Sequence, residues 1–281
     1  MRAGAVVENN LFQGHHQAAG IALGPSKEAL LTARVGKRMR ALGIDDERRY
    51  LDYLEADRTG EELVQFLDVI STNHTSFFRE PDHFDLLRTL VDEWRRTGLR
   101  RLRIWCAASS TGEEPYSIVM TVLDVLQDPD IDFKVLATDI STRALTDARQ
   151  GVYSIDKLTA IPRPFLERYF QRDESASDTY RVRDEVKQHV VFRRLNLAQP
   201  PFPMRGPLDV VFCRNVLIYF DLPVRQRLLT AISALLRPEG WLFLGHTETL
   251  TGITSGFRMA RPSVFFLPSE GELPAEAGLL P

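Results

Sequence analysis

The sequence predicts an α/β protein in which helices cover a parallel sheet and a helical bundle precedes it. From Leu99 onward, short apolar runs typical of strands alternate with segments of helical periodicity, as in a parallel sheet. Residues 27–70 instead show segments of helical periodicity. A polar loop and a stretch of period 2 interrupt the alternation between Gly151 and Val191, which indicates a small inserted antiparallel piece.

The N-terminal part is expected to form three short amphipathic helices, at 27–42, 46–56 and 61–70. Ser26 can cap the first, because its hydroxyl can accept a hydrogen bond from a backbone N–H of the first turn. Gly43 is suited to end that helix. Residues 1–20 have weak periodicity and are expected to be a disordered tail.

A helix over 82–97 leads into the alternating part. We expect strands at 101–106, 133–138, 190–195, 208–213 and 240–245, separated by helices at 114–126, 141–149 and 223–236. The inserted piece contains a short helix at 164–170 and an alternating stretch at 180–186. A last pair of strands is expected near 257–260 and 264–267, and the Gly-, Glu- and Pro-rich tail 269–281 is expected to be disordered.

Composition narrows the class of protein. With 281 residues and 44% hydrophobic content, the chain can bury one large core or two smaller ones, and its net charge of −3 argues against an extended nucleic-acid surface. Cys106 and Cys213 lie in or beside apolar strand patterns, which predicts reduced, buried thiols rather than a disulfide or metal site. Neither a membrane-spanning run nor a signal peptide is visible, so a cytoplasmic protein is expected.

The most informative stretch is R-I-W-C-A-A-S-S-T-G-E-E-P-Y-S-I-V-M at 103–120, where a strand runs through small residues into a helix. Small residues let the backbone approach a ligand closely. Glu114, just inside the helix, is favoured by the helix dipole and can accept hydrogen bonds from ligand hydroxyl or amino groups. Asp139 ends the next strand at about the spacing of a ribose-binding acid. These features predict a nucleoside-cofactor site.

The turn itself discriminates between cofactors. It holds one glycine, Gly112, where a pyrophosphate-binding fingerprint has three, so NAD and FAD are disfavoured. S-adenosylmethionine (AdoMet) carries no phosphate and tolerates Ala or Ser in such a turn. The alternative is a strand–helix unit without a ligand.

Other polar residues fall at expected strand ends or in an unusual connector. The connector S-T-N-H-T-S-F-F-R-E-P at 71–81 includes Arg79, whose guanidinium suits a carboxylate, although a capped helix start with a surface arginine is the alternative. Asn196, Arg214 and Asn215 follow strands, at the edge where open α/β sheets bind ligands. Tyr219 can point its hydroxyl into the same crevice, although a half-buried tyrosine with a wet hydroxyl is commoner. His246 can serve as a general base, but a structural histidine is the more frequent case.

Four motifs, T-N-x-T-x-F-F-R-E, S-T-G-E-E-P-Y-S, C-R-N-V-L-I-Y-F-D and G-H-T-E, occur in this order and resemble those of the CheR family of chemoreceptor glutamate O-methyltransferases. The resemblance covers about 20–267. It implies an all-α domain at 21–80 and a doubly wound, Rossmann-like AdoMet-binding domain at 81–268 with an inserted antiparallel β-subdomain at 151–191. It also implies methyl transfer from AdoMet to glutamates on the cytoplasmic helices of chemoreceptors, giving glutamyl methyl esters and S-adenosylhomocysteine, with no metal.

The resemblance also assigns residues. The cofactor contacts it implies are Asn73, Thr75, Arg79, Glu114, Asp139, Asn196, Leu197, Arg214, Asn215 and Val216. It places Arg79 and Tyr219 next to the transferred methyl group. A basic helix face resembles the family's receptor-docking surface and suits an acidic helical partner, although a solvated face is the alternative; it consists of Arg34, Lys37, Arg38 and Arg40.

The sequence leaves the mode of receptor binding and some alternative functions open. Some family members bind a receptor's C-terminal peptide with a Gly-x-Gly loop of the inserted subdomain, but the loop here, Q-R-D-E-S-A-S-D-T, has no glycine. Binding of such a peptide is therefore not predicted from this loop.

A methyltransferase acting on another protein carboxylate and a signalling adaptor that binds AdoMet without turnover are the alternatives. A nucleic-acid methyltransferase is disfavoured because R-N-V-L-I-Y-F stands where an amine-directed enzyme often has Asn-Pro-Pro-aromatic. The protein is expected to be a monomer without nucleic-acid partners or membrane insertion.

Overall fold

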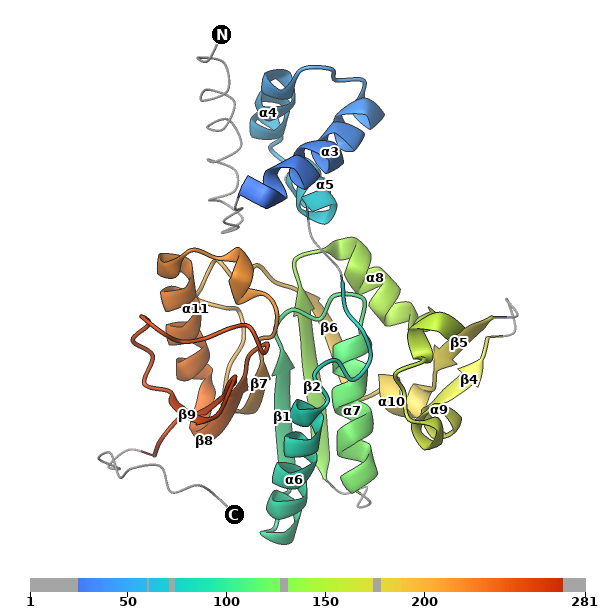
Figure 1. The fold of residues 1–281 in the computed structure, drawn as a ribbon, viewed down its shortest axis with the longest axis vertical. Helices are drawn as coiled ribbons and strands as arrows, with labels where there is room; N and C mark the ends of the chain where they lie inside the picture. Colours follow the sequence, from blue (N-terminus) through green and yellow to red (C-terminus); the bar gives the residue numbers. More distant parts are fainter. Residues whose placement is uncertain (1–24, 60, 71–73, 127–130, 174–177, 270–281) are drawn as a thin grey trace.

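The computed structural model describes residues 25–59, 61–70, 74–126, 131–173 and 178–269. The expected tail at 1–20 and all but the first residue of the tail at 269–281 lie outside these ranges. Figure 1 shows a helical group beside one edge of a sheet that is flanked by helices, with a second small sheet at the side. The α/β class and the preceding helical group are therefore confirmed.

The helical group consists of α3 (Pro25–Leu42), α4 (Glu47–Ala56) and α5 (Glu61–Ile70). Gly43 ends α3 with a positive φ of 70°, and Ile44 donates its backbone N–H to the Met39 carbonyl, 2.9 Å away. Asp46 caps α4 by accepting from the Arg49 backbone N–H. The apolar faces of the helices meet in a separate small core, whose buried members are Val35, Met39, Tyr50, Leu54 and Phe66.

The main sheet has seven strands in the order β6-β2-β1-β7-β8-β10-β9. Their bounds are β1 (Arg101–Cys106), β2 (Asp132–Asp139), β6 (Val190–Arg194), β7 (Leu208–Phe212), β8 (Leu236–Phe243), β9 (Arg258–Arg261) and β10 (Val264–Phe266). The strands from β6 to β8 pair in parallel, whereas β10 is antiparallel to both β8 and β9. The chain order reverses between β1 and β7, and at such a switch point the loops after the two strands diverge and leave a ligand crevice.

Helices cover both faces of this sheet. Because side chains alternate along a strand, Ile104 packs with α6 (Asp82–Arg96) and α7 (Glu113–Val125), whereas its neighbour Trp105 packs in the core of α11 (Leu222–Leu235). The helix α8 (Thr142–Gln150) follows β2 and contacts both that strand and β6. The inner strand β7 is buried along its whole length and is apolar apart from Asp209, as a parallel strand covered on both faces requires, whereas the edge strands β6 and β9 carry exposed arginines. Cys106 and Cys213 are buried free thiols, as expected.

The inserted piece forms a separate antiparallel sheet of three strands in the order β3-β5-β4. Its elements are β3 (Val152–Ser154), the 3₁₀ helix η1 (Ile155–Leu158), α9 (Arg163–Tyr169), β4 (Phe170–Arg172), β5 (Thr179–Val182) and α10 (Asp184–Lys187). The prediction of one alternating strand over 180–186 was wrong in its second half, where α10 begins. Val182 and Val186 are both buried, and a spacing of four fits a strand and a helix equally well.

Candidate active site

The candidate site lies at the carboxyl edge of the main sheet, where the loops after β1, β2, β7 and β8 meet the segment before α6. Four of the six described non-glycine residues with positive φ belong to these segments: Phe78, Glu80, Ser110 and Asn215. A left-handed backbone costs roughly 1–2 kcal/mol per residue, so it persists where surrounding bonds enforce it. This concentration of backbone strain makes the edge the candidate functional region.

Arg214 is the centre of this region. Its guanidinium is fully buried and lies 2.9 Å from a Glu114 carboxylate oxygen and 2.8 Å from Glu80 Oε2. It also donates to the backbone carbonyl of Arg79 and lies over the ring of Phe84. One cation therefore joins the segment before α6, the start of α7 and the end of β7.

The two carboxylates respond differently to burial. Burial raises the pKa of Glu114, and the charge of Arg214 opposes that rise only in part. Burial also opposes ionisation of Glu80, but the hydrogen bonds and charge of Arg214 hold the pKa of Glu80 below its usual value. Glu114 additionally accepts from the Cys106 thiol at 3.2 Å, and burial raises the pKa of this thiol so that it stays protonated and donates. With one guanidinium for two carboxylates, the centre favours a cationic ligand.

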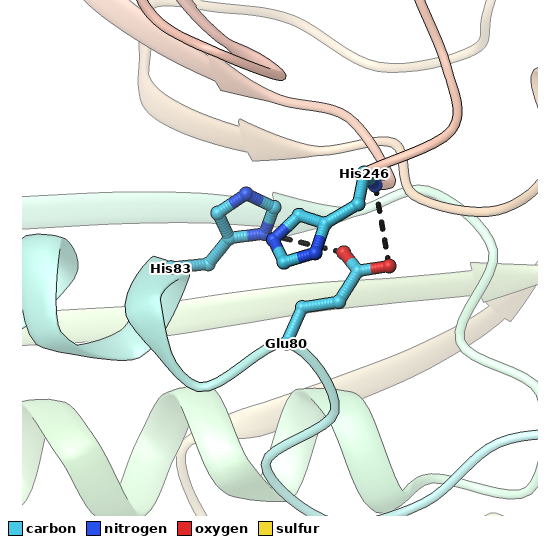
Figure 2. A group of neighbouring side chains, drawn as sticks. All are labelled: Glu80, His83 and His246. Atoms are coloured by element: carbon cyan, nitrogen blue, oxygen red, sulfur yellow. Dashed lines mark hydrogen bonds and ion pairs between the residues drawn. The ribbon is translucent and has the colours of Figure 1, made fainter.

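Glu80 also lies beside two histidines, as Figure 2 shows. The possible ligand atoms of Glu80, His83 and His246 lie within 4.8 Å of one another, a spacing that a metal ion could use. Burial, together with the charge of Arg214, lowers the pKa of His83 to about 4, so this ring is neutral at neutral pH. Its Nδ1 faces Glu80 at 3.5 Å, and its Nε2 lies 3.0 Å from the Ser263 hydroxyl.

The bonds already made by Glu80 decide what this cluster can do. Its Oε2 accepts from Arg214, and its Oε1 accepts from the Asn215 side-chain amide at 3.3 Å and from the His246 backbone N–H at 3.2 Å. The His246 ring is itself bonded to Asp82 at 3.0 Å. A metal ion would have to displace these donors, so the geometry favours a hydrogen-bonded clamp over a metal centre.

Both carboxylate oxygens of Asp139, at the end of β2, accept hydrogen bonds from backbone N–H groups. Asp139 accepts from the Ser110 N–H at 2.8 Å and from the Ser141 N–H at 2.9 Å. Burial raises the pKa of Asp139, whereas these N–H groups lower it. The hydroxyls of Ser109 and Ser110 are buried and make no hydrogen bond within the described residues. Unpaired buried hydroxyls beside a carboxylate fit a site that a polar ligand completes.

Gly112 has a packing role rather than a phosphate-binding one. Its φ is 99°, and a Cβ there would lie 2.8 Å from the Tyr153 hydroxyl and 2.9 Å from the Ala148 Cβ. The Tyr153 hydroxyl donates to the Thr111 carbonyl at 2.8 Å. The single glycine thus lets the turn after β1 lie against β3 and α8.

Two residues central to this region, Glu80 and Glu248, are not among the site residues predicted from the sequence. Each lies in one of the four motifs, Glu80 in T-N-x-T-x-F-F-R-E and Glu248 in G-H-T-E. Buried Glu248 accepts from the backbone N–H groups of Gly245 at 2.6 Å, Asn215 at 2.8 Å and Ile218 at 3.3 Å. It thereby ties the loop after β8 to the loop after β7. The only feature of the sequence that could have indicated Glu248 is the presence of a glutamate in a loop between apolar segments.

The remaining expected site residues lie around this centre. Arg79 is half-buried and donates from its guanidinium to the His74 carbonyl at 3.2 Å, and Tyr219 ends the short 3₁₀ helix η2 (Leu217–Tyr219) and is half-buried. Asn196 follows β6 and accepts from the Ala198 N–H at 3.0 Å. Leu197 is buried, Thr75 and Val216 are half-buried, and Asn73 lies outside the described residues.

The basic face of α3 is not uniform. Lys37 and Arg40 are exposed, and Arg34 is half-buried. Arg38 donates from Nε and Nη2 to the buried carboxylate of Glu62, at 3.0 and 2.5 Å, and Glu62 also accepts from the Tyr50 hydroxyl at 2.8 Å. The charge of Arg38 is therefore compensated within the helical group, and Lys37 and Arg40 carry the exposed positive charge.

Comparison with known proteins supplies the family context. The family model described as "CheR methyltransferase, SAM binding domain" matches residues 73–266, and "CheR methyltransferase, all-alpha domain" matches residues 9–71. None of the described helices is long and apolar enough to cross a membrane.

Named relatives match over most of their length. The chain is 39% identical over 256 residues to the chemotaxis protein methyltransferase of Salmonella typhimurium, covering 91% of this chain and 88% of that protein. It is 41% identical over 254 residues to chemotaxis protein methyltransferase 2 of Pseudomonas aeruginosa, covering 89% of each. Among solved structures, it is similar to magnesium protoporphyrin IX methyltransferase from Synechocystis PCC 6803 with bound SAM, at 16% identity and a TM-score of 0.38, covering 78% of this chain and 94% of that one.

Proposed function

Because the chain belongs to the CheR methyltransferase family, we propose that it transfers the methyl group of AdoMet to glutamate side chains of chemoreceptors, giving glutamyl methyl esters and S-adenosylhomocysteine. The observation that carries the proposal is the buried anionic centre at the switch point, where Glu80 and Glu114 share Arg214. AdoMet is a sulfonium cation with an amino group, and this centre suits such a charge.

When bound, AdoMet supplies an electrophilic methyl group on a positively charged sulfur. We propose that Asp139 accepts from the ribose hydroxyls and that Glu114 and Asn215 face the methionine part. The other cofactor contacts we propose are Asn73, Thr75, Arg79, Asn196, Leu197, Arg214 and Val216. The unpaired hydroxyls of Ser109 and Ser110 support a polar ligand in the same place.

The substrate carboxylate needs orientation rather than a general base. A glutamate has an unperturbed pKa of about 4.3, so it is ionised at neutral pH. Arg79 and Tyr219 offer the donors that can hold it for in-line attack on the methyl carbon. The opposite charges of carboxylate and sulfonium cancel during transfer, so excluding water from the crevice favours the reaction. His246, bonded to Asp82, is not required as a base in this scheme.

We propose further that the enzyme acts in the cytoplasm as a monomer, without a metal, nucleic acid or membrane insertion. The saturation of Glu80 by donors from Arg214, Asn215 and the His246 backbone supports the absence of a metal.

The decisive assay uses AdoMet labelled in its methyl group, a cytoplasmic receptor fragment and a metal chelator. The proposal is supported if the receptor fragment becomes labelled and if base then releases this label as methanol. A fragment with glutamine at the methylation positions is the control. Tight AdoMet binding without ester formation would favour the adaptor, and base-labile label on a different protein alone would favour another carboxylate substrate.

Substituting Tyr219 by phenylalanine should separate chemistry from binding. The change removes one hydroxyl with little change in volume, and a lost hydrogen bond to a charged group corresponds to roughly a 10- to 100-fold lower kcat. The dissociation constant of AdoMet should stay within about twofold of wild type. Tyr180→Phe, in the inserted sheet, is the matched control, and wild-type turnover in Tyr219→Phe would reduce Tyr219 to a wall of the crevice.

Reversing two exposed charges on α3 should weaken receptor docking. Lys37→Glu combined with Arg40→Glu places like charges against an acidic receptor helix, so the KM of the double variant for the receptor fragment should rise several-fold. Added salt should lower the activity of wild type more than that of the double variant, because salt screens the attraction in wild type. Affinity for AdoMet should not change. Arg96→Glu with Arg100→Glu makes the same change in net charge at the opposite edge of the sheet and serves as control. An equal KM in both double variants would show that the α3 face is only solvated.

A further inference from the structure

Asp68, on α5, reaches from the helical group to the first residue of α8. The Thr142 hydroxyl donates to Asp68 Oδ2 at 2.8 Å. The other carboxylate oxygen, Oδ1, is buried and makes no hydrogen bond within the described residues. Burying an acceptor without a donor costs about 1–3 kcal/mol. This oxygen would therefore be stabilised by a hydrogen-bond donor, which the described residues do not provide.

The surroundings of Asp68 indicate what the partner is. Thr142 lies three residues after Asp139, whose carboxylate is held between the turns that follow β1 and β2. Five buried side-chain polar atoms make no hydrogen bond within the described residues, and three of them lie in this neighbourhood: Asp68 Oδ1, Ser109 Oγ and Ser110 Oγ. Burial raises the pKa of Asp139, and the charge of Asp68 contributes to that rise. The unpaired atoms therefore lie on segments bonded to Asp139 or to the start of α8 three residues later, next to the place proposed for the ribose.

The position of α5 is fixed by packing as well as by this hydrogen bond. Ile140, the residue after Asp139, packs against the small core of the helical group, and α5 contacts α8. Figure 1 shows the lower end of α5 close to the start of α8. No ion pair to Asp68 exists within the described residues. The Asp68 carboxylate is thus held where its charge acts on Asp139, and no cation of the described residues is paired with it.

We propose that Asp68 is a further cofactor-binding residue, whose Oδ1 accepts a hydrogen bond from a hydroxyl or amino group of the nucleoside part of AdoMet. This inference rests on the proposed function. It makes the helical group one wall of the cofactor crevice in addition to a receptor-docking module.

Calorimetry on the full chain tests the proposal with three probes: AdoMet, S-adenosylhomocysteine and 5′-methylthioadenosine, which keeps the nucleoside and lacks the amino acid part. Asp68→Ala should weaken the binding of all three by about tenfold or more. Thr142→Val, which removes only the interdomain bond, should change them far less. In the Thr142→Val background, Asp68→Ala should still cost about the same factor.

Two outcomes would overturn the proposal. If Asp68→Ala and Thr142→Val lower the affinity equally and their effects do not add, Asp68 is a positioning residue that acts only through the turn between β2 and α8. If Asp68→Ala leaves the dissociation constants unchanged, Asp68 is not part of the site. Asp68→Leu, nearly isosteric and without polar atoms, replaces the alanine variant if that does not fold. Wild type and Asp139→Ala are measured in parallel. Failure of wild type to bind AdoMet would refute the proposed function, whereas binding unaffected by Asp68 would refute this inference alone.

Discussion

Replacing Arg214 by methionine is expected to lower the free energy of unfolding by about 3–5 kcal/mol, the cost typical of removing one partner of a buried ion pair. The methionine keeps most of the apolar volume, but it leaves Glu80 and Glu114 buried without their shared guanidinium. Urea denaturation at constant pH measures the change. Arg163→Met, which breaks the exposed pair with Glu167, is the control and should cost no more than about 1 kcal/mol.

The loss should also depend on pH in a defined direction. Without Arg214, burial raises the folded-state pKa of both glutamates above the unfolded value, so the folded variant holds protons that the unfolded chain has released. Stability of the variant therefore falls as pH rises through the range between the two values. The gap to wild type should be smaller near pH 5 than near pH 8. A loss comparable to that of Arg163→Met would show that Arg214 is dispensable for the fold.

Replacing Asp139 by alanine is expected to weaken AdoMet binding by about one to two orders of magnitude, because charge-assisted hydrogen bonds are worth roughly 1.5–3 kcal/mol each. The same change leaves the N–H groups of Ser110 and Ser141 without their acceptor, so some stability is lost as well. Titrations must therefore be run well below the variant's Tm. Asp147→Ala, on the exposed face of α8, is the matched control. An unchanged dissociation constant would place the ribose elsewhere.

Much of the architecture could be predicted from the sequence because its elements follow from local periodicity. Alternating apolar runs define parallel strands, and the polar residues that follow such strands must gather at one edge. This geometry explains why Glu114, Asp139 and Arg214 could be predicted as candidate site residues before the fold was known. The failure at Asp184–Lys187 has the same origin, because Val182 and Val186 fit both periods.

The contacts that organise the site could not be predicted in this way. Arg214 pairs with Glu80, 134 positions away in the sequence, and no local pattern encodes such a partner. Glu248 is recognisable only through the three backbone groups it accepts from. Helical spacing put Arg38 on the basic face of α3, but whether Glu62 compensates its charge depends on how α3 packs on α5.

The carboxylate of Glu248 has a consequence for how the crevice can move. It holds the Gly245 amide in one loop and the Asn215 and Ile218 amides in the other. Separating the loops would leave a buried carboxylate and several amides unsatisfied at once, which makes independent fluctuation of either loop costly. Tyr219, one residue after Ile218, is thus carried on a coupled pair of loops. The two loops are therefore expected to move together, so that a displacement of one displaces the other.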